Sequence, residues 1–240
     1  MHTRKLSLKK EDQVRRNPSV RFAIVGNPRT GSSHLVSLLD SHPDIACWDD
    51  EILDEGEAFD TSPFEDPRDF LRKVVFDVNA KAVGFKLLWD ALERTDGVWN
   101  LLKDLEIRLV HTCRSNALDG LLSYRLAKTN NSFTSWYGAW TVTRIALDPG
   151  DCVAWFEQTR LHDEEIRRHS QEHGLSRVEI EYEELVRTQD KVLEFLGMPK
   201  IPLTSRLVKQ RKGTQSELIT NYVELKSTFK GTPWIRFFED

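Results

Sequence analysis

The stretch RFAIVGNPRTGSSHLVSLLD, residues 21–40, decides the fold. Its first six residues are mostly apolar and end at a glycine, which predicts a buried strand over 21–26. The polar loop that follows leads directly into an apolar spacing typical of a helix. Because a loop of this kind directs backbone N–H groups and a helix N-terminus at one spot, the stretch predicts a binding site for an anion such as a phosphate.

Two glycines in this loop, Gly26 and Gly31, have the spacing of a nucleoside-triphosphate-binding loop. Such a loop carries a lysine directly after its second glycine, where this chain has Ser32, and the nearest cation is Arg29. The predicted strands also lack a terminal aspartate suited to Mg²⁺, Asp90 being the nearest candidate. The loop therefore fits a phosphate-like group without the metal of ATP hydrolysis. An ordinary tight turn before a capped helix is the alternative interpretation.

Strands and helices alternate along the rest of the chain. Further strands are predicted at 45–48, 82–88, 106–113 and 177–182, and further helices at 68–79, 97–105, 117–128 and 153–173. This alternation predicts an α/β protein with a P-loop-like three-layer fold, in which helices flank a central parallel sheet.

Composition limits the classes of protein to which the chain can belong. Of 240 residues, 39% are hydrophobic and 30% charged, which excludes a disordered or fibrous chain. The net charge of −4 does not indicate nucleic-acid binding. No run approaches the roughly 18 apolar residues of a membrane span, and the first residues lack the apolar segment of a secretory signal. Residues 1–19 carry six basic and two acidic side chains, which predicts a mobile basic arm before a single domain at 20–240.

The three cysteines, Cys47, Cys113 and Cys152, have no CxxC or Cys/His ligand spacing. They predict reduced thiols in a cytoplasmic protein, without a disulfide scaffold or structural zinc. No feature of the sequence predicts the oligomeric state.

A second candidate anion site follows the strand predicted at 106–113. That strand ends at Arg114, and the next helix carries Ser123 nine residues later. Because the carboxyl ends of parallel strands meet at one edge of a sheet, Arg114 is expected beside the first loop. A guanidinium and a hydroxyl are good partners for a second phosphate. The two sites together indicate a nucleotide that carries phosphates at two positions.

These segments resemble a family of enzymes, the sulfotransferases that use 3′-phosphoadenosine 5′-phosphosulfate (PAPS) as donor. The segment PRTGSSHL (28–35) resembles the 5′-phosphosulfate loop of that family, and RLVHTCRSNALDGLLSYRLA (108–127) resembles its 3′-phosphate motif. VEIEYEELVRTQDKVLEFLGMP (178–199) is similar to its tyrosine-glutamate segment and Phe-Leu-Gly turn. Residues 207–240 are similar to the end of the bacterial carbohydrate branch, which includes Nod-factor and trehalose-type enzymes.

The resemblance implies a set of donor-binding residues and no metal. It assigns the 5′-phosphosulfate to the loop and the 3′-phosphate to Arg114 and Ser123. The residues expected to bind the donor PAPS, and the product PAP after transfer, are Pro28, Arg29, Thr30, Gly31, Ser32, Ser33, Arg114, Ser123 and Tyr182. Tyr182 also has a structural interpretation, as the residue that closes the sheet edge.

The sequence departs from the phenol and steroid branch of the family in two places. That branch has a lysine in its phosphosulfate loop and a histidine base on a KTH-type strand, whereas this chain has Arg29 and a strand without histidine. A closing RKG motif is matched by residues 211–213, but alignment through Asn221 favours Lys209 instead. One of Lys209, Arg211 and Lys212 is therefore expected to reach the 3′-phosphate.

The resemblance also implies the groups that act on the transferring sulfuryl group. Glu51 occupies the position of the catalytic base, and its acidic neighbours are expected to raise its pKa toward neutrality. Lys86 and Arg29 are expected to neutralise the bridging oxygen. A solvated carboxylate is the alternative for Glu51, and a lysine that extends to solvent from a strand end is the alternative for Lys86. His111 is expected to be a hydrogen-bonded core residue.

The acceptor is the least determined part of the reaction. Phe133, Trp136, Tyr137 and Trp140 either line an acceptor cleft or pack in the core. Residues 49–69 hold ten acidic side chains and one basic, which disfavours polyanions. The resemblance therefore predicts a PAPS-dependent sulfotransferase that acts on a hydroxyl of a sugar, glycolipid or small molecule. A P-loop kinase or other phosphotransferase and an inactive nucleotide-binding module are the alternatives.

Overall fold

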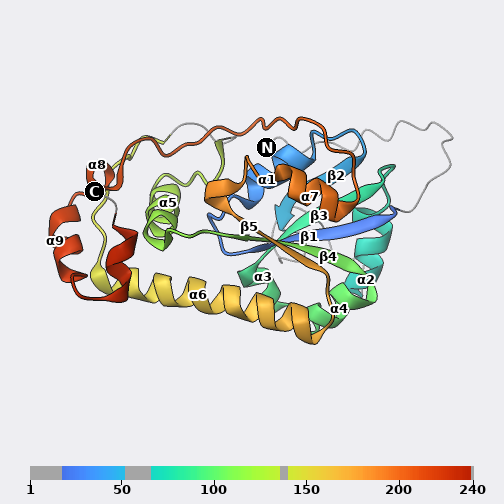
Figure 1. The fold of residues 1–240 in the computed structure, drawn as a ribbon, viewed down its shortest axis with the longest axis horizontal. Coiled ribbons are helices and arrows are strands. Elements are labelled where there is room, and N and C mark those ends of the chain that lie inside the picture. Colours follow the sequence, from blue (N-terminus) through green and yellow to red (C-terminus); the bar gives the residue numbers. More distant parts are fainter. Residues whose placement is uncertain (1–17, 52–65, 136–139, 239–240) are drawn as a thin grey trace.

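Five parallel strands form the centre of the protein (Figure 1). The computed structural model describes residues 18–51, 66–135 and 140–238, apart from the side chains of Asp50 and Glu51. The sheet has the order β2-β3-β1-β4-β5, and every neighbouring pair is parallel. Its strands are β1 (Val20–Gly26), β2 (Ile45–Glu51), β3 (Ala82–Leu88), β4 (Ile107–Cys113) and β5 (Arg177–Glu181). The three-layer α/β fold predicted from the sequence is confirmed.

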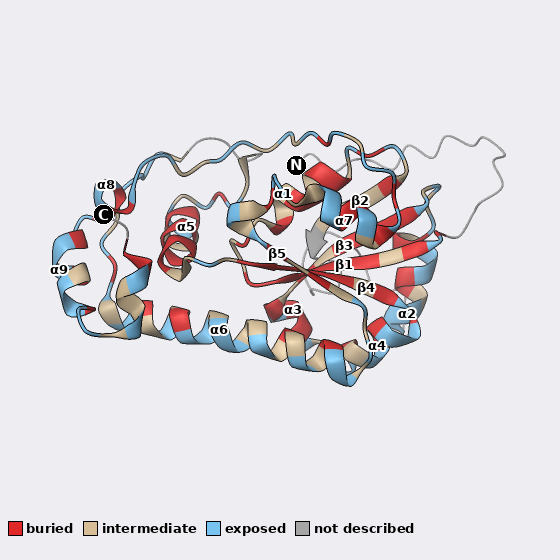
Figure 2. Cartoon of the chain, viewed as in Figure 1, coloured by how far each residue is buried: buried red, intermediate tan, exposed pale blue. Residues whose placement is uncertain are grey.

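Both faces of the sheet are buried, as the near-continuous apolar runs of the strands require. In β1, Phe22 and Ile24 belong to the hydrophobic core on one face, whereas Ala23 and Val25 belong to the core on the other. The helices α1 (Ser32–Leu39) and α7 (Gln189–Leu196) cover the first face. The second face is covered by α2 (Pro67–Phe70), the π-helical turn Leu71–Val75, α3 (Trp89–Arg94), α4 (Val98–Asp104) and part of α6 (Pro149–Glu172). Figure 2 shows the buried strands between helices whose outer faces are exposed.

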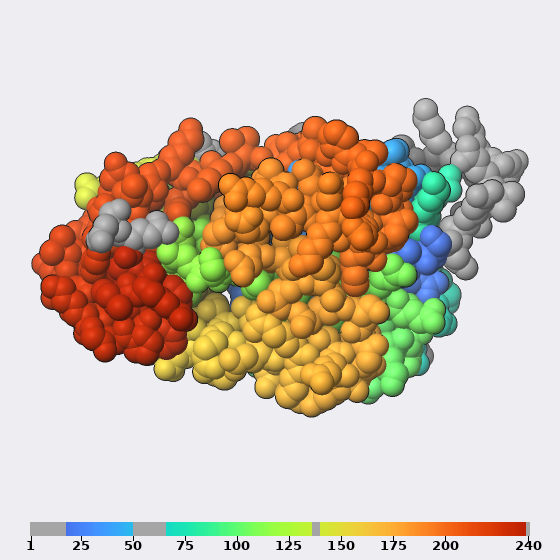
Figure 3. All heavy atoms as spheres, in the orientation of Figure 1, coloured from blue at the N-terminus to red at the C-terminus, as the bar shows by residue number. Residues whose placement is uncertain are grey.

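A third apolar core lies beyond the sheet, where the last part of the chain packs on the start of α6 (Figure 3). Phe156 is its centre, with ring centroids 4.9 Å from Phe237, 5.6 Å from Trp234 and 5.9 Å from Phe229. The elements that share this core with α6 are α5 (Ala117–Thr129), α8 (Gln215–Leu218), α9 (Tyr222–Thr228) and the 3-10 helix Pro233–Phe237.

The predicted strands and long helices match the structure closely, and the differences have local causes. Helix α6 begins at Pro149 and not at 153, because the Asp148 side chain caps it by accepting from the Asp151 N–H and proline suits the first helical turn. The segment 68–79 is a short helix followed by a π-helical turn, which closes when the Phe76 N–H donates to the Leu71 carbonyl at 2.8 Å. The predicted basic arm lies outside the described residues except for Pro18 and Ser19.

Candidate functional site

The phosphate loop connects β1 to α1 at the carboxyl edge of the sheet, the usual ligand edge of a parallel fold. Gly26 has a φ of +151°, and a Cβ there would lie 2.2 Å from the Thr112 carbonyl oxygen. Gly31 has a φ of +85°, and its Cβ would lie 2.7 Å from Cδ2 of Tyr182. Both positions therefore require glycine. Thr30 is buried and bonds the Asn27 carbonyl at 2.7 Å and the Thr112 hydroxyl at 2.8 Å, so its side chain holds the loop together.

Arg29 extends from this loop toward the second predicted anion site. Its φ of +67° is unusual for a residue with a Cβ. Its Nε donates to the Ser123 hydroxyl at 3.0 Å and its Nη1 to the Phe133 carbonyl at 2.5 Å. Burial, together with the nearby charge of Arg114, lowers the pKa of Arg29 to about 10. The structure thus places Arg29 beside Ser123, the hydroxyl expected at the 3′-phosphate.

Arg114 and Arg211 meet at one buried carboxylate, Asp119. Arg211 donates to both carboxylate oxygens at 2.5 Å, and Nη2 of Arg114 donates to one of them at 3.1 Å. Gln215 adds a fourth bond at 3.1 Å. Burial raises the pKa of Asp119, but the hydrogen bond and charge of Arg211 and the charge of Arg114 outweigh it, so the pKa lies below its ordinary value. The carboxylate is therefore ionised and holds two guanidinium groups in place.

Arg114 also joins this cluster to the loop and to the 3-10 helix Tyr182–Glu184, which follows β5. Its Nη1 donates to the Arg29 carbonyl at 3.1 Å, and its guanidinium lies 4.3 Å from the centre of the Tyr182 ring. Nε lies 3.8 Å from a Glu183 carboxylate oxygen and, although buried, has no hydrogen-bond partner. A buried charged donor without a partner favours an anionic ligand at this position.

Lys86 lies at a different part of the loop. Its Nζ is 3.2 Å from Oδ1 of Asp49 and 3.5 Å from Oγ of Ser33, and its side chain is 12% exposed. The strands β2 and β3 pair in parallel, and their register shifts between Trp48 and Glu51. After this shift the backbone of Glu51 is paired with that of Lys86. The side chain of Glu51 lies outside the described part of the structure. The carboxylate that the described residues place beside Lys86 is that of Asp49.

The phosphate loop, Lys86 and the cluster of Arg114, Asp119 and Arg211 line one large pocket of about 1310 Å³, and Asp49 is not part of its lining. Of the predicted site residues whose side chains are described, two do not line this pocket: Lys212, which is exposed, and Thr30, which is buried. The predicted site residues that the pocket brings together are Pro28, Arg29, Gly31, Ser32, Ser33, Lys86, Arg114, Ser123, Tyr182, Lys209 and Arg211.

The aromatic group predicted near the acceptor is only partly described. Phe133 lines the pocket and is 42% exposed. The indole N–H of Trp140 donates to the Ser132 carbonyl at 2.9 Å, and Trp140 packs on the core around Phe156. Trp136 and Tyr137 lie outside the described residues.

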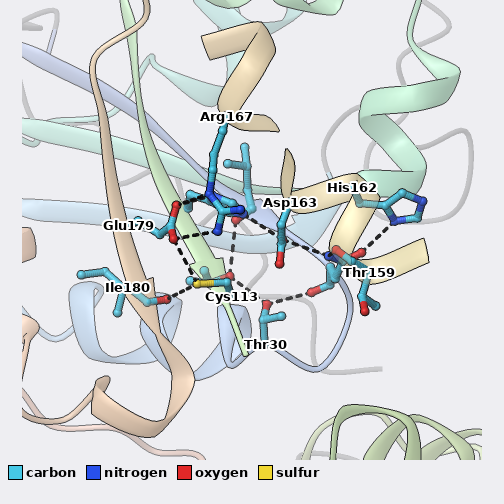
Figure 4. A network of polar contacts seen from close by, with 12 residues as sticks. Thr30, Cys113, Thr159, His162, Asp163, Arg167, Glu179 and Ile180 are labelled. Atoms are coloured by element: carbon cyan, nitrogen blue, oxygen red, sulfur yellow. Dashed lines mark hydrogen bonds and ion pairs between the residues drawn. The ribbon is translucent and has the colours of Figure 1, made fainter. Parts of the chain in front are cut away.

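A network of polar contacts joins α6, β4 and β5 to the phosphate loop (Figure 4). The Asn27 amide donates to Oδ1 of Asp163 at 3.0 Å, and the same oxygen lies 3.0 Å from Nε2 of His111. Nδ1 of His111 faces Glu179 at 3.3 Å, and Arg167 donates to both oxygens of Glu179 at 2.9 and 2.8 Å. The chain of contacts therefore runs from α6 and β5 through the sheet to the loop.

His111 is completely buried in this network, so its prediction as a hydrogen-bonded core residue is confirmed. Burial lowers the pKa of an imidazole, but the hydrogen bond to Asp163, the close contact with Glu179 and the charges of these carboxylates give His111 a pKa above its ordinary value. The contact with His111 and the pair with Arg167 in turn lower the pKa of Glu179. These contacts therefore favour the protonated form of the imidazole.

Three residues that contact the site were not predicted from the sequence to have a role in it: Asp49, Asp119 and Asn27. Asp119 has a local signal, since the Asn116 side chain accepts from its N–H and marks it as a first-turn residue of α5. Nothing in the sequence indicates that Arg211, 92 positions away, would bind it. Asn27 is adjacent to the first glycine, but its partner Asp163 is 136 positions away.

The three cysteines are free and buried, and burial raises the pKa of Cys113 and Cys152 to about 12.

Among the helices of the described ranges, none is both long enough and apolar enough to cross a membrane.

Comparisons with known proteins give consistent results. No protein-family model matches the chain. Nodulation protein H of Rhizobium meliloti strain 1021 is 26% identical over 247 residues, which cover 92% of this chain and 96% of that protein. Nodulation protein H of Rhizobium tropici is 26% identical over 239 residues, which cover 91% and 92%. A crystal structure of a sulfotransferase from Alicyclobacillus acidocaldarius matches with a TM-score of 0.52 at 18% identity, over 94% of this chain and 95% of that one. The resemblance indicated by the sequence motifs is therefore confirmed over most of the chain, and the fold is similar to that of the Alicyclobacillus sulfotransferase.

Proposed function

We propose that the protein is a sulfotransferase that moves a sulfuryl group from PAPS to a hydroxyl of a carbohydrate, glycolipid or small-molecule acceptor, and that residues 20–240 form its single domain. One observation carries the proposal. A single pocket has guanidinium groups and the Ser123 hydroxyl at one part of its wall, and the phosphate loop with an ammonium group at another. A nucleotide with phosphates at its 3′ and 5′ positions needs two cationic sites of this kind.

The 3′-phosphate is proposed to bind where Arg29, Arg114 and Ser123 meet. This changes the role expected for Arg29 from the sequence, which was at the bridging oxygen of the 5′-phosphosulfate, because its guanidinium bonds the Ser123 hydroxyl. Arg211 is the favoured third cation among the candidates of residues 209–212, because its guanidinium shares Asp119 with Arg114. Lys209 lines the same pocket, whereas Lys212 does not. The unpartnered Nε of Arg114 supports this assignment, since a phosphate oxygen would complete its hydrogen bonding.

The 5′-phosphosulfate is proposed to bind at the start of α1. The backbone N–H groups and hydroxyls of Ser32 and Ser33 are suited to the non-bridging oxygens. Lys86 is within reach of the Ser33 hydroxyl, so its ammonium can stabilise the charge that develops on the bridging oxygen. In the transfer, the acceptor oxygen forms a bond to sulfur while the bond between sulfur and the bridging oxygen breaks. The electron pair of that bond leaves with the 5′-phosphate of PAP.

A carboxylate is proposed to take the proton of the acceptor hydroxyl. Glu51 remains the candidate, because the strand ladder pairs its backbone with that of Lys86. Asp49 is the competing carboxylate, but its contact with Lys86 favours a role in orienting the ammonium group. Glu51→Gln is therefore expected to lower turnover by about 10²–10⁴ without weakening the binding of PAP. If Glu51→Gln kept full activity and Asp49→Asn were inactive, the base would be Asp49 and not Glu51.

Two further properties are part of the proposal. The acidic segment 49–69 favours a neutral or cationic acceptor over a polyanion. The three free, buried cysteines suit a reducing compartment, so we place the protein in the cytoplasm.

The test is thermal unfolding of the full chain with PAP, with 5′-AMP, and with ATP plus Mg²⁺. A ligand that binds the folded state at a hundredfold excess over Kd stabilises it by about 2.7 kcal/mol. We expect a clear rise of Tm with PAP, a smaller one with 5′-AMP because it lacks the 3′-phosphate, and little change with ATP. A larger rise with ATP than with PAP would favour a phosphotransferase. A rise with PAP but no transfer to any acceptor in a screen would favour an inactive binding module.

A further inference from the structure

Three side chains of the kind that bind metals meet at the C-terminal end of α6. His169 and Glu172 lie in the last turn of this helix, and His173 caps it. The spacing of four residues places both imidazoles on one face of the helix. One ligand atom from each of the three residues lies within 4.8 Å of the others. The large pocket includes none of them.

Contacts around the cluster hold the two imidazole rings in place. Nδ1 of His173 is 2.9 Å from the His169 carbonyl, and when its N–H donates there, the lone pair of Nε2 stays available. Nδ1 of His169 is buried without a hydrogen-bond partner and lies 3.7 Å from Oε2 of Glu172. The Trp99 ring of α4 stacks on His169 at 4.7 Å between centroids and 10° between planes. In Figure 1, α4 lies beside this end of α6.

We propose that His169, Glu172 and His173 bind one divalent transition-metal ion, of the class of Zn²⁺, Ni²⁺ and Cu²⁺. Two imidazoles and one carboxylate are the ligands that these ions prefer, whereas Mg²⁺ and Ca²⁺ prefer oxygen ligands alone. The unpartnered Nδ1 of His169 gains a partner when the ion binds. Because the site is partly exposed, water completes the coordination.

Arg168 opposes binding at this site. Its guanidinium donates to both carboxylate oxygens of Glu172 at 2.8 Å and lies 2.9 Å from Nε2 of His169. It also bonds Glu165. Since its side chain is 48% exposed, it can turn toward solvent when an ion enters. The site is therefore expected to bind more tightly once this competing positive charge is removed.

The fluorescence of Trp99, which stacks on His169, can report binding of the ion. Ni²⁺ is added to the full chain while tryptophan fluorescence is followed, because a paramagnetic ion on His169 is in position to quench the Trp99 ring stacked on it. The chain has seven tryptophans, so Trp99→Phe identifies the quenched residue. We expect Zn²⁺ to displace Ni²⁺ and restore the fluorescence, and Mg²⁺ to have no effect. Quenching that persists in Trp99→Phe, or equal displacement by Mg²⁺, would overturn the proposal.

Variants separate this site from nonspecific binding to histidine. His173→Gln is expected to weaken Ni²⁺ binding at least about tenfold, since changes of even the outer groups of metal sites typically cost about 10–100-fold. Arg168→Ala is expected to strengthen it. His162→Ala is the matched control, because His162 stacks on Trp89 in the same way, at 4.5 Å and 12°, and is not part of the cluster. Equal affinity in His173→Gln and the unaltered chain, or equal losses in His173→Gln and His162→Ala, would refute the site.

Discussion

Replacement of the buried Asp119 by asparagine tests the charge arrangement of the pocket most directly. The change keeps the shape of the side chain but removes the one negative charge between Arg114 and Arg211. The side chains of the three residues are only 8–11% exposed. Breaking a buried ion pair from one side costs about 3–5 kcal/mol, because it leaves charge uncompensated. We use the lower end of this range, about 3 kcal/mol, because the amide oxygen of the new asparagine still accepts a hydrogen bond.

A loss of about 3 kcal/mol lowers Tm by roughly 6–12 °C in a domain of this size. The same reasoning predicts that PAP raises Tm more in Asp119→Asn than in the unaltered chain, because its phosphate supplies the missing negative charge. Differential scanning calorimetry with and without PAP measures both effects.

The matched control is Asp151→Asn, which removes a carboxylate that lies 2.5 Å from Arg125. These side chains are 52% and 35% exposed, so the pair is worth about 0.2–1 kcal/mol and the control should change Tm by no more than about 4 °C. An Asp119→Asn protein as stable as this control would refute the buried charge cluster. A smaller rise of Tm with PAP in Asp119→Asn would show that the carboxylate positions the arginines for the ligand and does not merely balance their charge.

Three further predictions follow from the pocket and its support. Lys86→Met is expected to lower turnover by about 10²–10³ while the rise of Tm with PAP is kept, measured as PAP released with an acceptor found by screening. Gly31→Ala is expected to abolish that rise and to cost about 1–3 kcal/mol in denaturant unfolding, because its φ is positive and its Cβ would collide with Tyr182. The raised pKa of His111 means that its protonated form adds stability fully below about pH 6.5, the ordinary value, and that this stability is lost as pH rises through the raised pKa. The difference in free energy of unfolding between the unaltered chain and His111→Gln should therefore shrink between pH 6 and pH 9, and a constant difference would contradict it.

The order of the strands and of the helices α1, α4, α5 and α6 was predictable, because β1, β3 and β4 are apolar runs and β5 alternates apolar with charged residues. The helices α3, α7, α8 and α9 were not predicted. Gly26 and Gly31 indicate a loop whose backbone must approach other atoms closely, and the structure shows the carbonyl of Thr112 and the ring of Tyr182 at those distances. The meeting of Arg114 with the loop was predictable from the parallel topology alone.

The orientation of side chains within the site was not predictable. The sequence does not indicate that Arg29 has a left-handed backbone conformation, which accompanies the placement of its guanidinium beside Ser123. Nor does it distinguish Arg211 from Lys209 and Lys212. That distinction depends on how residues 207–211 pass along the pocket, and it becomes visible only through the contact of Arg211 with Asp119.

The contact of Asp119 with Arg211 and Gln215 also bears on the order in which the protein is assembled during synthesis. Arg114 and Asp119 are five positions apart and can pair as soon as α5 forms, whereas Arg211 and Gln215 leave the ribosome almost a hundred residues later. Until then the wall that holds these groups is incomplete, although β1 to β4 and the phosphate loop have already been made. A nascent chain would therefore have the phosphate loop but not the full set of cations for a nucleotide, so ligand binding would begin only after residues 211–215 have been made.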